Sequence, residues 1–160
     1  MFKKIAIAAA LALIASSSFA AEATGVYVGA SVGSTKVDGL SGQKTSYIGL
    51  VGYQVTDVLA FEGSYGRVAD YTISSVDVKM NQAAISMVGA VPMGNGFKLF
   101  GRLGYNNMEA TANGHSASTS KALYGIGVSY SFAANVAARF EVTKPSSDAT
   151  NVALGVTYKF

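Results

Sequence analysis

The chain contains 160 residues, half of them hydrophobic, with no cysteine and a formal net charge of +3 at pH 7. The missing cysteines exclude disulfides and thiolate metal sites, and a single histidine among scattered carboxylates predicts no metal centre and no cofactor. No run of like charges forms the basic patch that nucleic-acid binding requires.

Residues 1–20 have the composition of a secretory signal peptide. Two lysines form a basic start, Ile5–Ala15 is an apolar stretch of about eleven residues, and small residues end the segment. The apolar stretch is too short for a membrane helix, which needs about 20 residues. We expect cleavage after Ala20 or Ala21, leaving residues 21–160 as one domain. The two lysines leave with the signal, so the formal charge falls from +3 to +1.

The rest of the chain shows strand patterns of about 9–12 residues separated by turn residues. Helical caps and the i, i+3, i+4 spacing of apolar residues are missing. The pattern predicts eight strands, which are Val26–Val32, Lys44–Val55, Leu59–Tyr71, Asp77–Val91, Phe97–Met108, Lys121–Phe132, Val136–Thr143 and Asn151–Phe160.

The connections between these strands alternate in length. Those after the second, fourth and sixth strands are tight, and Pro92 is expected to end the fourth strand. Outer-membrane barrels have short periplasmic turns and longer external loops. The pattern therefore predicts four longer polar loops on one side of a barrel, at Val37–Gln43, Thr72–Val76, Thr111–Ser118 and Lys144–Thr150.

Each strand has one face of large apolar residues and one face of small or polar residues. An eight-stranded barrel has little interior space, so the large side chains would overfill it if they pointed inward. We therefore predict an all-β, eight-stranded antiparallel up-and-down transmembrane barrel with an apolar exterior and a small, polar, filled interior. Aromatic residues toward strand ends are expected at the lipid–water interface: Tyr27, Tyr53, Phe61, Tyr65, Phe97, Tyr105, Tyr130, Phe132, Tyr158 and Phe160.

Several short motifs, in order, resemble the OmpA-like outer-membrane β-barrels and cover essentially all of residues 21–160. They are Gly25–Ala30, Gly52–Glu62, Arg102–Tyr105, Arg139–Glu141 and Gly155–Phe160. The resemblance implies export to the cell outer membrane, a monomer in contact with lipid and lipopolysaccharide, and no peptidoglycan-binding domain after the barrel. It is nearest in architecture to the smaller OmpX and opacity-type surface barrels. It also implies that Val156, Tyr158 and Phe160 form a C-terminal signal read by the barrel-assembly machinery.

The resemblance also implies a charge cluster inside the barrel. In OmpA-like barrels a lumenal Glu pairs with basic side chains of other strands, and Glu62, Arg102 and Arg139 match those positions. Glu141 lies two residues from Arg139 and therefore on the same face. Two interpretations remain open: an ion-pair gate in a narrow water path, or a structural cluster in which buried charges neutralise one another.

Several residues near the predicted external end could have a catalytic, interfacial or lipid-binding role. His115 and Ser116 are adjacent in a predicted loop, where neighbours rarely adopt triad geometry. Arg67 falls on the lipid-facing parity, which predicts either a position near the interface or a bulge. Lysines that could bind lipopolysaccharide phosphates are Lys36, Lys44 and Lys79.

The sequence therefore predicts an outer-membrane barrel with a structural or surface-interaction role, which includes membrane integrity, adhesion or contact with a host through the external loops. A narrow small-solute pore is the main alternative, and a lipid-A-modifying enzyme is a further one. We expect no enzymatic activity. The sequence names no surface ligand, and it predicts no nucleic-acid partner.

Overall fold

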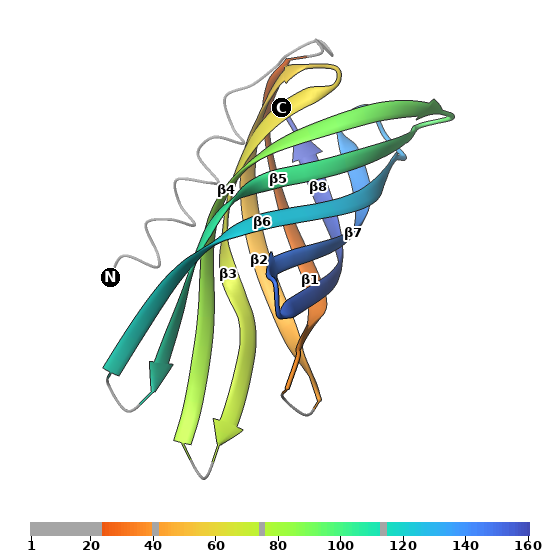
Figure 1. The fold of residues 1–160 in the computed structure, drawn as a ribbon. Helices are drawn as coiled ribbons and strands as arrows, with labels where there is room; N and C mark the ends of the chain where they lie inside the picture. The colour runs from red at the N-terminus through yellow and green to blue at the C-terminus, as the bar shows by residue number, and fades with distance from the viewer. Residues whose placement is uncertain (1–23, 40–41, 74–75, 113–114) are drawn as a thin grey trace.

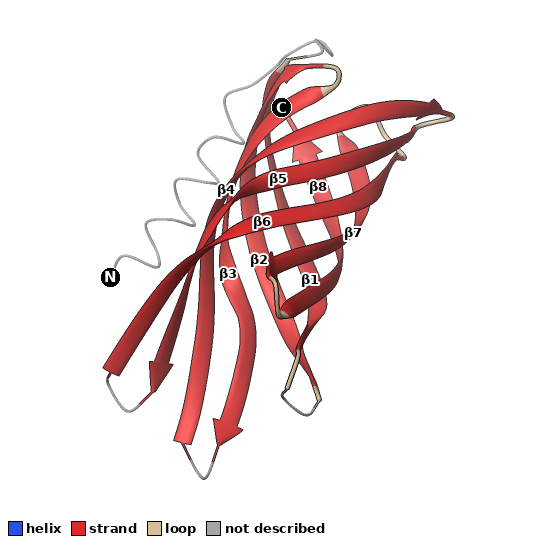
Figure 2. Cartoon of the chain, in the orientation of Figure 1, coloured by secondary structure: helices blue, strands red, loops and turns tan. Residues whose placement is uncertain are grey.

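A computed structural model describes residues 24–39, 42–73, 76–112 and 115–160, and for residues 70–79 and 112–115 it describes only the backbone. The described residues form eight antiparallel strands that follow the chain around one closed barrel (Figures 1 and 2). They are β1 (Gly25–Val37), β2 (Gln43–Thr56), β3 (Leu59–Ile73), β4 (Val76–Gly94), β5 (Phe97–Ala112), β6 (His115–Ser131), β7 (Val136–Ser146) and β8 (Ala149–Lys159).

Closure of the barrel depends on the pairing of the first strand with the last. β1 pairs with β8 from Tyr27 opposite Lys159 to Val37 opposite Ala149. This pairing removes the two edges that an open sheet would expose. Because the strand number is even, β1 begins and β8 ends at the same end of the barrel, here called the terminal end. The opposite end is called the distal end. Within the described ranges, no helix has the length and hydropathy needed to span a membrane.

The eight predicted strands and their order are confirmed, but several predicted ends are wrong. β4 continues through Pro92 to Gly94, and β7 continues through Pro145. Each proline lies where the pairing register shifts, between Pro92 and Gly94 and between Thr143 and Ser146. A bulge is one of the few sheet positions that tolerates the missing N–H of proline, so these prolines interrupt the pairing without ending the strand.

Three of the four predicted long external loops are wrong, whereas the predicted loop Val37–Gln43 agrees with the connection at residues 38–42. β5 ends at Ala112 and β6 begins at His115, so most of Thr111–Ser118 is strand. Similarly, β3 ends only at Ile73 and β4 already begins at Val76. Only residues 147–148 lie between β7 and β8. The serines and threonines of these segments resemble a loop, but Thr has a high strand propensity and both faces of a projecting hairpin can remain in water. Of the four connections, the one at 38–42 is the longest.

Two hairpins project beyond the rest of the barrel at the distal end (Figure 1). β4 has 19 residues and β6 has 17, whereas β7 and β8 have 11 each. β6 pairs with β5 out to His115, but its pairing with β7 covers only Tyr124–Ser131. In the described part of the chain, His115–Leu123 is therefore paired along one side only. The projecting sheet is thus built from the outer parts of β3, β4, β5 and β6.

The two faces of the wall have the predicted chemistry. Large apolar side chains on the outside have high exposure, including Ile85 at 72%, Leu103 at 61% and Leu154 at 62%. The alternate positions are small or polar and lie inside. Tyr27 departs from the prediction, because it shares the inward parity of Gly29 and Ser31 and is buried at 9% exposure rather than placed at the lipid interface.

Arg67 lies at the rim of the wall. It is opposite Tyr47 of β2, which is 61% exposed on the outer face, and it is the last β3 residue that pairs with β2. The predicted bulge is present, but it follows Arg67: the β3–β4 register shifts between Arg67 and Ala69. Val68 and Ala69 are both buried after this shift. Arg67 therefore remains on the outer face, next to the point where β3 leaves the barrel wall.

Candidate functional site: the charged lumen and its vestibule

A cluster of four charged side chains fills the middle of the lumen. β3 contributes Glu62, β5 contributes Arg102, and β7 contributes both Arg139 and Glu141. All four have inward parity on their strands, so the sequence prediction that they share one interior is consistent with their placement. The side chain of Glu62 has no exposed surface, and the other three have between 5% and 13%.

Glu62 is the centre of this cluster. Its Oε1 accepts a hydrogen bond of 2.5 Å from Nη1 of Arg139, and its Oε2 accepts one from Nη2 of Arg102. Glu141 accepts a hydrogen bond of 2.6 Å at Oε1 from Nε of Arg102. Nη2 of Arg139 lies 3.5 Å from Oε2 of Glu141. Two carboxylates and two guanidiniums thus neutralise one another, which is the condition under which buried charges are tolerated.

Three uncharged side chains complete the cluster and were not predicted as part of it. Tyr27 donates a hydrogen bond of 2.6 Å to Oε1 of Glu62, and Nη1 of Arg102 donates one of 3.1 Å to Oγ of Ser86. The guanidinium carbon of Arg139 lies 4.4 Å from the centre of the Phe100 ring. The parity of Tyr27 with Gly29 was the signal that could have placed it inside.

Glycines leave the space that these large inward side chains occupy. A Cβ added at Gly52 would meet the Tyr27 ring, with one ring carbon and the hydroxyl oxygen each 2.6 Å away. A Cβ at Gly127 would likewise meet the Phe100 ring, one carbon of which, Cε1, would lie 2.9 Å away. Small residues on the inward face are therefore a packing requirement of the cluster.

A second polar layer lies nearer the distal end. Nδ2 of Asn151 donates hydrogen bonds of 2.8 Å to Oγ1 of Thr35 and 2.7 Å to Oγ of Ser46, and all three residues are buried. Nearby in the same half, Nδ2 of Asn106 donates to the carbonyl oxygen of Pro145 at 2.7 Å. Side chains from β1, β2, β5, β7 and β8 thus fill the lumen between the charged cluster and the distal end. Filling of this kind is what an eight-stranded interior allows.

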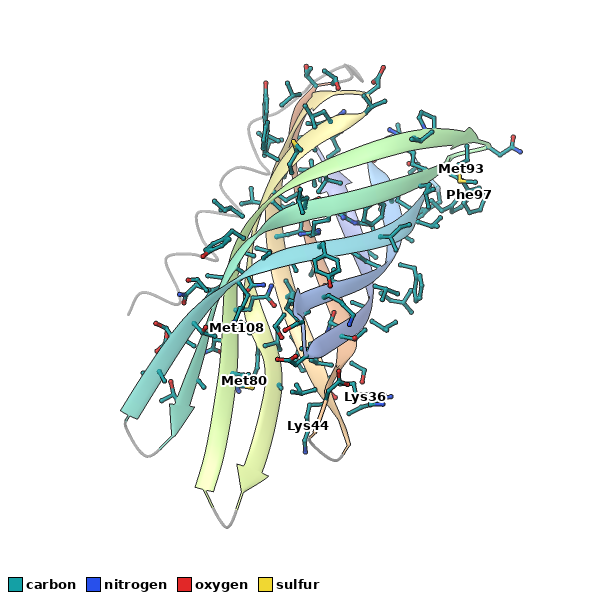
Figure 3. The ribbon with its side chains drawn as sticks, in the orientation of Figure 1. Lys36, Lys44, Met80, Met93, Phe97 and Met108 are labelled. Carbon is teal, nitrogen blue, oxygen red and sulfur yellow. The ribbon has the colours of Figure 1, made fainter. Side chains whose placement is uncertain are left out.

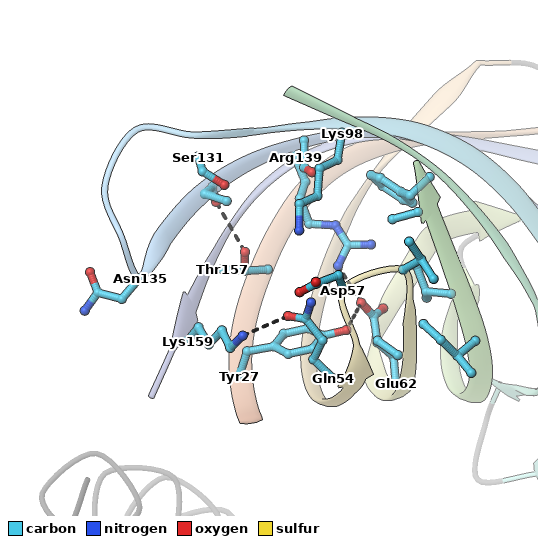
Figure 4. Close-up of a pocket in the computed structure, with 18 of the residues that line it drawn as sticks. Tyr27, Gln54, Asp57, Glu62, Lys98, Ser131, Asn135, Arg139, Thr157 and Lys159 are labelled. Carbon is cyan, nitrogen blue, oxygen red and sulfur yellow. Dashed lines mark hydrogen bonds and ion pairs between the residues drawn. The ribbon is translucent and has the colours of Figure 1, made fainter. Parts of the chain in front are cut away.

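At the terminal end the lumen opens into a cavity of about 530 Å³, here called the vestibule (Figure 4). Tyr27, Glu62 and Arg139 form its inner limit. The turn residues Asp57 and Asn135 belong to its rim. The filled lumen and the open vestibule therefore divide the barrel interior into two unlike halves.

The remaining predicted residues lie apart from the cluster. Figure 3 places Lys36 and Lys44 at the distal end. The side chains of Lys79 and His115 lie outside the described residues, although the backbone of His115 begins β6. Oγ of Ser116 lies 3.0 Å from Oγ1 of Thr111, across the β5–β6 pair. Among the described residues, no group of three or more His, Cys, Asp or Glu side chains could hold a metal ion.

The residues of the C-terminal motif point outward. Val156 is 50% exposed and Tyr158 is 40% exposed. The rings of Tyr158 and Phe160 meet edge to face with centres 5.1 Å apart. The side chains thus form one apolar strip on the outer face of β8.

A closed barrel with an apolar outer wall, projecting hairpins at one end and a filled polar interior defines the class of transmembrane β-barrels. Residues 6–160 match the family described as "Outer membrane protein beta-barrel domain", and the chain belongs to this family. Its location is the cell outer membrane of a Gram-negative bacterium. No curated protein matches the chain.

Solved structures with the same fold share little sequence with this chain. The N-terminal β-barrel domain of Pseudomonas aeruginosa OprF has a TM-score of 0.64 at 18% identity, over 86% of this chain and 99% of that one. Ail, the attachment invasion locus protein of Yersinia pestis, in complex with the heparin analogue sucrose octasulfate, has a TM-score of 0.59 at 18% identity, over 86% and 97%. Neisserial surface protein A has a TM-score of 0.58 at 19% identity, over 87% and 98%. These similarities show the shared barrel fold.

Proposed function

We propose that this protein is a surface-interaction barrel whose filled body anchors the projecting sheet in the outer membrane. The main support for this function is the length of β5 and β6 at the distal end, where His115–Leu123 of β6 pairs along one side only. The termini of outer-membrane barrels lie with the short periplasmic turns. On this orientation the distal end faces outward and presents the projecting sheet to the environment.

The open side of β6 has the chemistry for strand addition. A strand paired on one side presents unused backbone N–H and C=O groups to an extended peptide. Ser116, Ser118 and Ser120 alternate along this segment with Ala117, Thr119 and Lys121, and the side chains of all six are exposed. Small hydroxyl side chains offer little steric obstruction to a partner strand. We therefore assign an extended segment of a surface or host protein as the partner class.

Truncation of the β5–β6 hairpin tests this function. Thr119 and Met108 form a facing pair, so replacing residues 109–118 by Asn-Gly would leave a two-residue turn in register. We expect cells with this variant to lose adhesion to surfaces coated with extracellular-matrix protein, while the barrel still migrates as a folded, heat-modifiable band. A matched variant replaces residues 38–42 by Gly and Ser and should keep adhesion. Full adhesion by the truncated, folded variant would reject the proposal.

The narrow pore remains the second candidate, and the vestibule is the observation that favours it. The vestibule extends into the lumen as far as Tyr27, Glu62 and Arg139. The charged cluster and the Asn151 layer then stand between the vestibule and the distal end, which supports an anchor more than a conduit. Single-channel steps in planar bilayers that change in an Arg139→Ala variant would favour the pore.

We propose that residues 1–20 are removed on export, that the barrel-assembly machinery reads the C-terminal strand, and that the mature barrel is a monomer without enzymatic activity. Exposed Lys36 at the distal end supports contact with lipopolysaccharide phosphates. N-terminal sequencing of the membrane protein checks the cleavage site, and release of acyl chains from lipopolysaccharide would reject the non-enzymatic assignment.

A further inference from the structure

The vestibule at the terminal end is a formed cavity that neither membrane anchoring nor surface contact uses. Its volume of about 530 Å³ lies within the roughly 300–1,000 Å³ of typical small-molecule sites. Its inner limit is fixed by the hydrogen-bonded Tyr27–Glu62–Arg139 group. A rigid inner limit and an open rim are the properties of a pocket that is present before a ligand arrives.

The walls of the vestibule differ in the polar groups that they carry. Strands β3, β4 and β5 supply an apolar wall of five residues, which are Leu59, Ala60, Val88, Ala90 and Phe100. The opposite wall, from β6, the β6–β7 turn, β7 and β8, supplies the hydroxyl and amide groups of Ser129, Ser131, Asn135 and Thr157, together with the apolar side chains of Ala134, Val136 and Ala137. The cavity is therefore amphipathic: an apolar body would pack against one wall while a polar head faced the other.

Two lysines give the rim an excess of positive charge. Lys98 of β5 and Lys159 of β8 both line the vestibule, and their charges repel each other. Nζ of Lys159 donates a hydrogen bond of 3.1 Å to Oε1 of Gln54 (Figure 4). Asp57 is the acidic residue of the rim and attracts Lys159. Since Glu62 and Arg139 at the inner limit neutralise each other, the charged side chains lining the vestibule sum to +1.

An anion between the two lysines would relieve their repulsion. Ammonium groups bind carboxylate and phosphate oxygens by charge-assisted hydrogen bonds, which are stronger than neutral ones. A cation of the same shape would meet two like charges and one carboxylate, and would bind less well. The positive rim therefore favours a negatively charged ligand, and the apolar wall favours a ligand whose remaining part is apolar.

We propose that the terminal-end vestibule binds a small amphipathic anion, with a carboxylate or phosphate head held by Lys98 and Lys159 and an aromatic or short aliphatic body packed against the Phe100 wall. On the orientation given above, this ligand enters from the periplasm. The site is separate from the projecting sheet, so it stands independently of the proposed surface function.

The test uses the full mature barrel in lipid nanodiscs and two probes with the same body, 4-phenylbutyrate and 4-phenylbutylamine. NMR titration should show saturable shifts of the Ala60, Ala90 and Ala137 amides with the butyrate, at an affinity about tenfold above that of the amine. Phenyl phosphate should compete if a phosphate head is also accepted, and failure to compete would restrict the ligand to carboxylates. Equal shifts from acid and amine would overturn the proposal, because they would indicate partition without charge selection.

Three variants connect the binding to the vestibule. The Lys98→Gln/Lys159→Gln double variant should lose about tenfold or more in butyrate affinity, whereas Lys36→Gln, at the distal end, should bind as the parent does. Ala90→Leu keeps both lysines but fills the apolar wall, and it should weaken the binding of acid and amine alike. Heat-modifiability confirms that each variant is folded. Unchanged butyrate affinity in the folded double variant would overturn the proposal.

Discussion

Glu62→Ala is the sharpest test of the charged cluster. The side chain is fully buried and accepts hydrogen bonds from Tyr27, Arg102 and Arg139. Removing one member of a buried ion pair costs about 3–5 kcal/mol, because the opposite charge remains buried without compensation. Here Glu141 still neutralises one of the two guanidiniums, so we expect a loss of about 3 kcal/mol in the free energy of unfolding.

The assay is urea unfolding of the barrel in lipid vesicles, followed by the shift of the heat-modifiable band. Glu109→Ala is the matched control, because Glu109 is an exposed residue of the projecting β5 hairpin and its loss should change little. The double variant Glu62→Ala/Arg139→Ala removes one charge of each sign and leaves Arg102 with Glu141. Its loss should fall short of the sum of the single losses by about 1–3 kcal/mol. Additive losses would show that Glu62 and Arg139 do not interact and would refute the reasoning.

Three further predictions concern assembly and packing. Deleting Phe160 should leave unfolded chain in the periplasm, because the apolar strip of β8 loses its end; normal amounts of protease-resistant barrel would contradict this. Gly52→Ala should destabilise the barrel by about 1–3 kcal/mol, because the added methyl meets the Tyr27 ring; in a Gly52→Ala/Tyr27→Ala variant the ring is absent, so its loss should fall short of the sum of the two single losses, and additive losses would show that the ring is not the cause. Replacing residues 38–42 by Gly and Ser should leave the unfolding midpoint nearly unchanged, and a lower midpoint would show that this connection supports the wall.

The sequence identified the faces of the strands because a period of two leaves little freedom: a shift of one residue moves every side chain to the other face. That rule placed Arg102 and Glu141 inside. Applied to Tyr27 it also predicts the interior, but the position of Tyr27 near a strand end favoured the interface in our sequence analysis. Strand ends were less predictable. The hydroxyl-rich start of β6 has no face to bury, so its alternation carries no hydrophobic signal.

Contacts between strands depend on information that one strand does not hold. Ser86 meets Arg102 because β4 and β5 pair with Ser86 opposite Gly104, two residues away, and that register is set by the whole ring. The vestibule was likewise not predicted, since its lysines come from β5 and β8 and its apolar wall from β3 to β5. Its sequence signal is only an inward lysine near the terminal end of each of two strands.

The pairing of β1 with β8 also constrains how the barrel can form. Tyr27 is opposite Lys159, so the contact that closes the ring joins nearly the first residue of the barrel to nearly the last. Contacts of such large sequence separation form slowly, because the entropy of ordering the intervening chain opposes them. Until that contact forms, β1 and β8 each present an unpaired edge to other chains. Such a chain must therefore be kept from aggregating after export until β1 and β8 have paired. Its folding rate should depend more on ring closure than on the formation of any one hairpin.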